Sequence, residues 1–217
     1  MTRRPAERGV VRGCCLGVIL LLVLLGLSAF VVDRAMAAPD LGAPPGGNDD
    51  GETQQAIAVS LGLQLGRDLV TQPHGVVTLT EHDLSVIAAA NNPHPDRYHD
   101  VSARVRDGFV VVSALTSYGP ISTTVVAHIG VALQQGGARL VATVVHVDVG
   151  DLPIPGWVQD HFVGSPTIQL DPLFNSNAAL QVLRANIECV LVAPDGVRVG
   201  VHRPGAAASP GVCGQGA

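Results

Sequence analysis

An unbroken run of twenty uncharged residues near the N-terminus is the feature that most constrains this chain. The run extends from Gly13 to Val32, and about twenty apolar residues are what an α-helix needs to cross the hydrocarbon core of a bilayer. The twelve residues before it carry four arginines and one glutamate, a net charge of +3. The positive-inside rule therefore predicts a basic cytoplasmic tail at residues 1–12, a transmembrane anchor at residues 13–32 and an extracytoplasmic remainder.

A cleaved signal peptide is the alternative interpretation of the same segment. Ala35-Met36-Ala37 fits a small-residue cleavage site, and cleavage near Ala37 would give a secreted protein. The apolar run is longer than a usual signal-peptide core, and Asp33 and Arg34 separate it from the site. The sequence therefore favours an uncleaved signal-anchor and a single-pass protein of the cell membrane.

The composition of the exported part excludes several classes of function. Residues 38–217 contain eight arginines and sixteen acidic residues, a net charge of −8, so we expect no binding to nucleic acid by counterion release. The chain has no lysine, which rules out Schiff-base chemistry and a P-loop lysine. Valine is abundant, with 33 residues, and this favours β-structure.

The exported part divides by composition into a linker at 38–51, a domain at 52–204 and a Gly- and Pro-rich tail at 205–217. Leucine and isoleucine recur every four residues between Glu52 and Gln72, which predicts a helix. A short strand at 76–79 and a second helix at 81–90 follow. Thr80 and Asp83 have the spacing of a capping box for that second helix.

Hydropathy then alternates with a period of two from Tyr98 to Val149. Short turns interrupt the pattern, and Asp107-Gly108 is a strong hairpin signal. The same device returns as a strand from Leu180 to Ala193, a turn, and a strand from Val197 to His202. Successive hairpins predict an antiparallel meander rather than βαβ units. The expected fold class is α+β, with the meander packed on two or three helices.

The strand expected at 140–149 is apolar on both faces. One face carries Leu140, Ala142 and Val144, and the other carries Val141, Val145, Val147 and Val149. An antiparallel strand with one wet face alternates cleanly, so both faces of this strand need cover. The helices can cover one face, which leaves the other for a second layer of protein, a membrane or an apolar ligand.

No established catalytic or cofactor-binding motif occurs in the chain. His94 and His99 flank a loop with Asp96 and Asp100, either a transition-metal set or, as we expect, a solvated connection. His146 and Asp148 share a strand face and can pair as a base and its orienter, or as a structural hydrogen bond. We expect the structural bond, no catalytic residue, no metal and no cofactor.

The four cysteines divide by compartment. Cys14 and Cys15 lie at the cytoplasmic edge of the predicted anchor and should stay reduced. Cys189 and Cys213 lie on the exported side, where disulfides persist, and they are candidates for a bridge that pins the tail to the last sheet.

The segment from Gly150 to Gly164 combines two prolines with concentrated aromatic surface. Pro153 and Pro155 predict that the strand ends by Leu152 and that a short helix follows. That helix would carry Trp157 and Phe162 on one face. It is either a lid that closes the end of the core or a mobile gate to an apolar groove. The expected groove has six lining residues, namely Leu84, Ile87, Val144, Ile154, Trp157 and Phe162.

Two segments carry a family resemblance. The sequence VTLTEHDLSVI, Val77 to Ile87, resembles the entry helix of YpmS-like exported proteins, and VVHVDVGDLPIPGWV, Val144 to Val158, resembles the strand and proline segment of the same group. A hairpin after an Asp-Gly turn is also similar. The resemblance implies a membrane-anchored domain with a curved antiparallel sheet wrapped over helices, distantly similar to tubular lipid-binding domains and without an assigned enzymatic activity.

Together these observations predict a non-catalytic, membrane-anchored extracytoplasmic domain that binds lipid or another apolar ligand. The alternative is a structural or accessory scaffold domain of an envelope membrane complex. A deep apolar groove favours the first function, and two filled layers favour the second.

Overall fold

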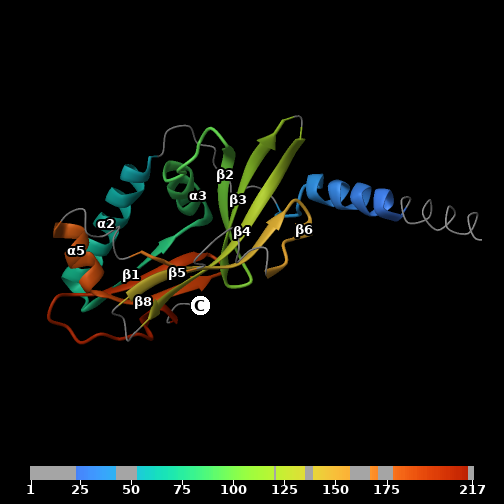
Figure 1. Cartoon of the computed structure of the whole chain (residues 1–217). Helices are drawn as coiled ribbons and strands as arrows, with labels where there is room; N and C mark the ends of the chain where they lie inside the picture. Colours follow the sequence, from blue (N-terminus) through green and yellow to red (C-terminus); the bar gives the residue numbers. More distant parts are fainter. Residues whose placement is uncertain are drawn as a thin grey trace, which may run out of the picture.

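The chain folds into antiparallel sheets and a few helices, as expected for the α+β class (Figure 1). The computed structural model describes six segments, namely residues 23–42, 53–119, 121–134, 139–156, 167–170 and 178–214.

The larger sheet has six strands and contains the predicted meander. Its path is β2-β3-β4-β5-β6, and β7 also pairs with β5. The strands are β2 (Tyr98–Arg106), β3 (Phe109–Tyr118), β4 (Ile121–Gln134), β5 (Arg139–Val149), β6 (Leu152–Pro153) and β7 (Thr167–Gln169). Asp107 and Gly108 both have positive φ, 52° and 79°, as a type I′ hairpin turn requires. The hairpin prediction at this position is confirmed.

The smaller sheet has three strands in the order β1-β9-β8. They are β1 (His74–Leu79), β8 (Ile187–Ala193) and β9 (Gly196–His202), and all pairs are antiparallel. Alternation along β9 directs Val197, Val199 and Val201 to one face. That face meets both the helices and the larger sheet.

Two helices, α2 and α3, lie where the sequence predicts them. Helix α2 (Gln54–Thr71) begins after Thr53, whose side chain accepts the N–H of Ala56. Helix α3 (Glu81–Ala90) has the predicted bounds, and Thr80 and Asp83 form the complete capping box. Each cap satisfies amide groups that have no partner within the helix.

The predicted strand from Leu180 to Ala193 is wrong in its first part. Residues 178–185 form helix α5 (Ala178–Ala185), and β8 begins only at Ile187. Alanine, leucine, glutamine and arginine fill most of α5, and these residues favour a helix. Leu183 of α5 packs on the same apolar cluster as Leu61 and Leu69 of α2, so tertiary packing supports the helix.

Among the described residues, two apolar clusters of the core lie between the layers. One joins α2 to the smaller sheet through Leu65, Val77, Ile187 and Val201. The other joins the two sheets through Ala103, Val110 and Val197, with Leu84 and Ala88 of α3 packed against it. The inner face of the larger sheet is therefore filled by protein.

Helix α3 also protects the free edge of β2. Ser85 Oγ accepts the N–H of Ala103 at 2.8 Å, and Glu81 Oε1 accepts the N–H of Val105 at 2.8 Å. Glu81 also forms an ion pair with Arg106 at 2.7 Å. The edge amides are thus occupied, which limits pairing with another chain.

The strand with two apolar faces is covered on both sides over its first half. Leu140, Val141 and Ala142 of β5 are all buried. The register between β4 and β5 shifts so that His128 faces His146 and Ile129 faces Val144. Val145 is therefore the extra residue of a β-bulge, and its side chain is 52% exposed.

The second face of the smaller sheet is closed by the C-terminal tail. Cys189 of β8 and Cys213 of a short 3₁₀ helix, η3 (Val212–Gly214), form a disulfide with Cα atoms 6.1 Å apart. Gly200 of β9 lies under this bridge, where an added Cβ would overlap Cys189 Sγ and lie 2.8 Å from Val212 Cγ1. Only glycine leaves room for the tail at this point.

Residues 23–36 form an apolar helix that projects from the end of the molecule opposite α2 and α5 (Figure 1). Val23, Leu24, Leu25 and Leu27 on this helix are each more than 50% exposed. Within the described residues no helix is both long and apolar enough to cross a bilayer. The predicted span begins at Gly13, and its residues 13–22 lie outside the described residues.

Candidate functional site

The residues that follow the apolar helix are fixed to the larger sheet by a set of contacts that we call the clamp. Asp151 donates its backbone N–H to the Arg34 carbonyl at 2.9 Å, and the two side chains form an ion pair. Thr123 Oγ1 donates to the Ala35 carbonyl. Gly150 has a φ of 61°, and an added Cβ would overlap the carbonyl groups of Arg34 and Ala35. These contacts therefore hold the end of the helix against the larger sheet.

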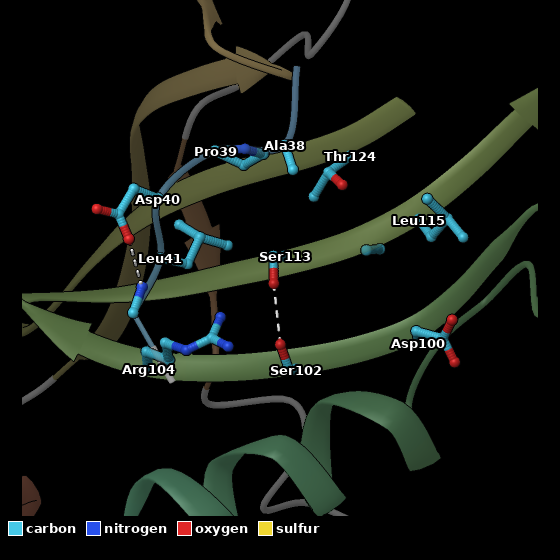
Figure 2. A pocket seen from close by; sticks show the side chains of 12 residues that line it. Ala38, Pro39, Asp40, Leu41, Asp100, Ser102, Arg104, Ser113, Leu115 and Thr124 are labelled. Carbon is cyan, nitrogen blue, oxygen red and sulfur yellow. Dashed lines mark hydrogen bonds between the residues drawn. The ribbon is translucent and has the colours of Figure 1, made fainter. Parts of the chain in front are cut away.

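Residues 38–42, which we call the strap, cross the outer face of β2, β3 and β4 (Figure 2). Burial alternates along this stretch: Pro39 and Leu41 are half-buried, whereas Ala38, Asp40 and Gly42 are exposed. Pro39 and Leu41 are therefore the residues turned to the sheet, and a hydrogen bond from the Leu41 N–H to the Pro39 carbonyl, at 2.9 Å, turns the backbone at Asp40. The start of the predicted linker is thus an ordered part of the site.

A cavity of about 360 Å³ lies between the strap and the outer face of the sheet. The strap forms one wall, and strands β2, β3 and β4 form the other (Figure 2). The lining residues are Ala38, Pro39, Asp40, Leu41, Gly42, Asp100, Ser102, Arg104, Ser113, Ala114, Leu115 and Thr124.

The cavity combines apolar and polar walls. Pro39, Leu41 and Leu115 supply apolar surface. The hydroxyls of Ser102 and Ser113 lie 2.9 Å apart and hydrogen-bond to each other across β2 and β3. The lining also includes the buried Arg104 and the carboxylates of Asp40 and Asp100. Such a mixed lining suits an amphipathic molecule, with apolar contacts for its chain and polar groups for its head.

A histidine network lies on the same outer face, along β4 and β5. His146 Nε2 is 2.8 Å from Asp148 Oδ1, and His128 Nε2 is 3.3 Å from Asp148 Oδ2. The His128 ring also makes edge contacts with the rings of Phe109 and His146. Both Nε2 atoms are turned toward one carboxylate, so the predicted His146–Asp148 pair is present and His128 shares it.

The loop with His94 and His99, a candidate for a metal site, lies at the start of β2. His94 lies in a turn before β2, and His99 lies on β2 opposite Leu115. Asp100 has a φ of 50° and lines the cavity. In the part of the chain that the structure describes, no group of three His, Cys, Asp or Glu residues is placed to hold a metal ion.

A second carboxylate network anchors the C-terminal tail. The Glu188 side chain is fully buried and lies 3.0 Å from His74 Nδ1 on β1. Its Oε2 accepts the backbone N–H of Ser209 at 2.7 Å. These partners compensate the burial of a carboxyl group, and they tie residues near the end of the chain to the first strand.

One carboxyl group has a shifted pKa. The hydrogen bond from Arg198 to Asp195, at 3.0 Å, lowers the pKa of Asp195 below its usual value of 3.8. Asp195 lies in the β8–β9 turn, away from the cavity lining. Its shift therefore concerns that turn and not the candidate site.

The residues predicted to line an apolar groove are distributed as follows. Leu84 packs against the inner cluster between the sheets, and Ile87 is half-buried on the same helix. Val144 is half-buried on β5, and the Ile154 N–H donates to the Val147 carbonyl at 3.1 Å. None of these four lines the cavity under the strap. Trp157 and Phe162 lie outside the described residues.

The sequence did not predict two features of the site. The composition of the strap, which is Ala, Pro, Asp, Leu and Gly, predicts a linker, and nothing local indicates that it packs on the sheet. His128 joins the network only through the bulge at Val145, which sets it opposite His146. The alternation of β4 predicts the face of the sheet on which His128 lies, but no pattern in the sequence predicts the bulge at Val145.

Comparisons with protein-family models, with curated proteins and with solved structures gave no match to this chain. The resemblance to YpmS-like proteins stays a prediction that depends on its two motifs.

Proposed function

We propose that this protein is a non-catalytic, membrane-anchored extracytoplasmic domain that binds an amphipathic, lipid-like molecule between the strap and the sheet. The observation that supports this function best is a cavity of about 360 Å³, with mixed lining, placed directly after the apolar N-terminal helix. Cavities of small-molecule sites have volumes of about 300–1,000 Å³.

The position of the cavity favours a ligand from the bilayer. The helix ends at Met36, and the first cavity residue is Ala38. Five extended residues span at most about 18 Å, so every strap residue lies near the anchor end. The exposed side chains of Val23, Leu25 and Leu27 are suited to lipid contact.

Several features favour binding over catalysis. The histidines of the two networks face the carboxylates of Asp148 and Glu188. The cavity lining contains neither histidine nor cysteine. A ligand would therefore meet the paired hydroxyls of Ser102 and Ser113 beside an apolar wall, which are recognition groups. The YpmS-like motifs also support a lipid-binding role.

Native mass spectrometry of the full chain tests this function. The protein is released from nanodiscs of phosphatidylcholine and phosphatidylglycerol, and bound lipid is identified by its mass. Leu115→Trp fills the cavity from its apolar wall. Ser117→Trp is the matched control, because Ser117 lies two residues further on the same strand and face, is exposed, and does not line the cavity.

We expect one lipid on the parent protein and on Ser117→Trp, and at least a tenfold higher Kd for lipid on Leu115→Trp, about 1.4 kcal/mol of binding free energy. Both variants should retain the melting temperature of the parent within a few degrees. A lipid-free parent, or equal lipid binding by both variants, would contradict the proposed ligand site.

A scaffold domain of an envelope complex is the second candidate. It is favoured by the filled interior, where Ala103, Val110 and Val197 close the space between the two sheets. A scaffold requires no cavity, so Leu115→Trp would then leave function unchanged. Stoichiometric co-purification with an envelope membrane protein, together with a lipid-free domain, would select this alternative.

A further inference from the structure

We propose that the strap is a hinged lid over the cavity, and that it lifts to admit a ligand while the clamp stays closed. This inference rests on the proposed ligand site and assigns its regulation. It separates residues 34–37, which hold the anchor in place, from residues 38–42, which move.

The clamp provides a fixed base for such a lid. The carbonyls of Arg34 and Ala35 each accept a hydrogen bond from the sheet region, from Asp151 and Thr123 respectively. The Ala37 N–H donates a hydrogen bond to the Asp33 carbonyl at 2.9 Å, and the helix ends there. Gly150 leaves no room for these residues to shift inward.

The strap is attached more weakly than its base. Among the described residues, its hydrogen bonds are local: the Leu41 N–H donates to the Pro39 carbonyl at 2.9 Å, and the Gly42 N–H donates to Asp40 Oδ1 at 3.2 Å. Both bonds lie within the strap and do not join it to the sheet. Contact with the sheet is therefore carried by half-buried apolar side chains, chiefly Pro39 and Leu41.

A ligand can replace the contacts that opening removes. Leu41 lies over β3 beside Ser113, at the wall of the cavity (Figure 2). An acyl chain inserted below the strap would cover the same apolar surface that Leu41 covers in the closed state. Within the described segments, lifting the strap breaks no hydrogen bond between residues 38–42 and the sheet, whereas opening of the clamp would break two.

The hinge lies between Ala37 and Ala38, directly after the hydrogen bond from the Ala37 N–H to the Asp33 carbonyl that ends the helix. A lid hinged there opens next to the anchor. The bilayer surface, the lid and the cavity are then neighbours along the chain, and a lipid can transfer without release of the domain from the membrane.

Amide hydrogen exchange on the full chain in phosphatidylcholine nanodiscs tests the lid directly. We expect the amides of Leu41 and Gly42 to exchange at least about tenfold faster than the clamp amides of Ala37 and Asp151. Addition of a pyrene-labelled phosphatidylcholine should slow Leu41 and Gly42 and leave the clamp amides unchanged. Equal exchange in strap and clamp would overturn the lid.

Ligand release gives the second readout. Leu41→Ala removes most of the apolar cover, and we expect it to speed release of the pyrene lipid by about threefold or more. Met36→Ala is the matched control, because Met36 is 50% exposed and lies on the clamp side of the hinge. An unchanged release rate in Leu41→Ala, with the parent melting temperature, would overturn the lid.

The two proposals fail in different ways. Lipid that remains bound in Leu41→Ala and in the parent, with no difference in exchange or release, leaves the ligand site and removes the lid. A parent that carries no lipid in the native mass spectrum removes both.

Discussion

Replacement of Gly150 by alanine should release the clamp. Gly150 has a φ of 61°, and an alanine Cβ would lie 2.6 Å from the Ala35 carbonyl carbon and 2.7 Å from the Arg34 carbonyl oxygen. The left-handed backbone costs an L-residue about 1–2 kcal/mol. The backbone overlap cannot be relieved by a side-chain rotation, so Arg34 and Ala35 must move away from the turn.

That movement removes two hydrogen bonds, from Asp151 N–H and Thr123 Oγ1, each of which contributes about 0.5–1.5 kcal/mol. The Arg34–Asp151 ion pair adds little, about 0–1 kcal/mol, since both side chains are nearly half exposed. We therefore expect Gly150→Ala to lower the free energy of unfolding by about 2–6 kcal/mol. Urea unfolding of the full chain in detergent, followed by circular dichroism, measures this change.

Gly108→Ala is the matched control. Gly108 also has a positive φ, 79°, but an added Cβ there has no neighbour within 4 Å. Gly108→Ala should therefore lower the free energy of unfolding only by the cost of the left-handed backbone, about 1–2 kcal/mol. Gly150→Ala should also accelerate proteolysis between the helix and α2. Equal unfolding free energies for the two variants, with equal proteolysis, would refute the clamp.

Three further predictions follow from the fold. Cys213→Ser opens the disulfide to Cys189 and should cost about 3 kcal/mol by the loop-entropy estimate, measured by urea unfolding against the oxidised parent; an unchanged midpoint would contradict a stabilising bridge. Thr80→Ala removes the cap of α3 and should cost about 1 kcal/mol in the same assay, whereas Thr80→Ser should cost less. The carboxyl of Asp195 should titrate below 3.8 by NMR, so its contribution to stability is full above that pH and is lost as pH falls through its native pKa. Arg198→Gln should return the titration to the usual range, and a parent midpoint at or above 3.8 would refute the interaction.

Local signals predicted the elements that are determined locally. The Asp107-Gly108 turn fixes a hairpin because both residues tolerate positive φ. Thr80 and Asp83 fix the start of α3 because their side chains satisfy amides within one turn. These rules act over three or four residues, so one sequence is sufficient to apply them.

Long-range packing decided the features that the sequence did not reveal. In residues 178–185 the composition favours a helix, and the contact of Leu183 with the α2 cluster supports that helix. The docking of Arg34 against Asp151 joins positions 117 residues apart. The cavity is lined by residues 38–42 together with residues of β2, β3 and β4, which lie far apart in the sequence, so no local pattern indicates it.

Photo-crosslinking of the full chain with a diazirine-labelled phosphatidylcholine tests the central claim most directly. The protein is labelled in nanodiscs, digested and sequenced by mass spectrometry. If the cavity under the strap binds lipid, label appears on residues 38–42 and on the β3 residues Ser113 to Leu115, and Leu115→Trp removes it from both. Label confined to the N-terminal helix, with none on the strap or on β3, would contradict the proposed function.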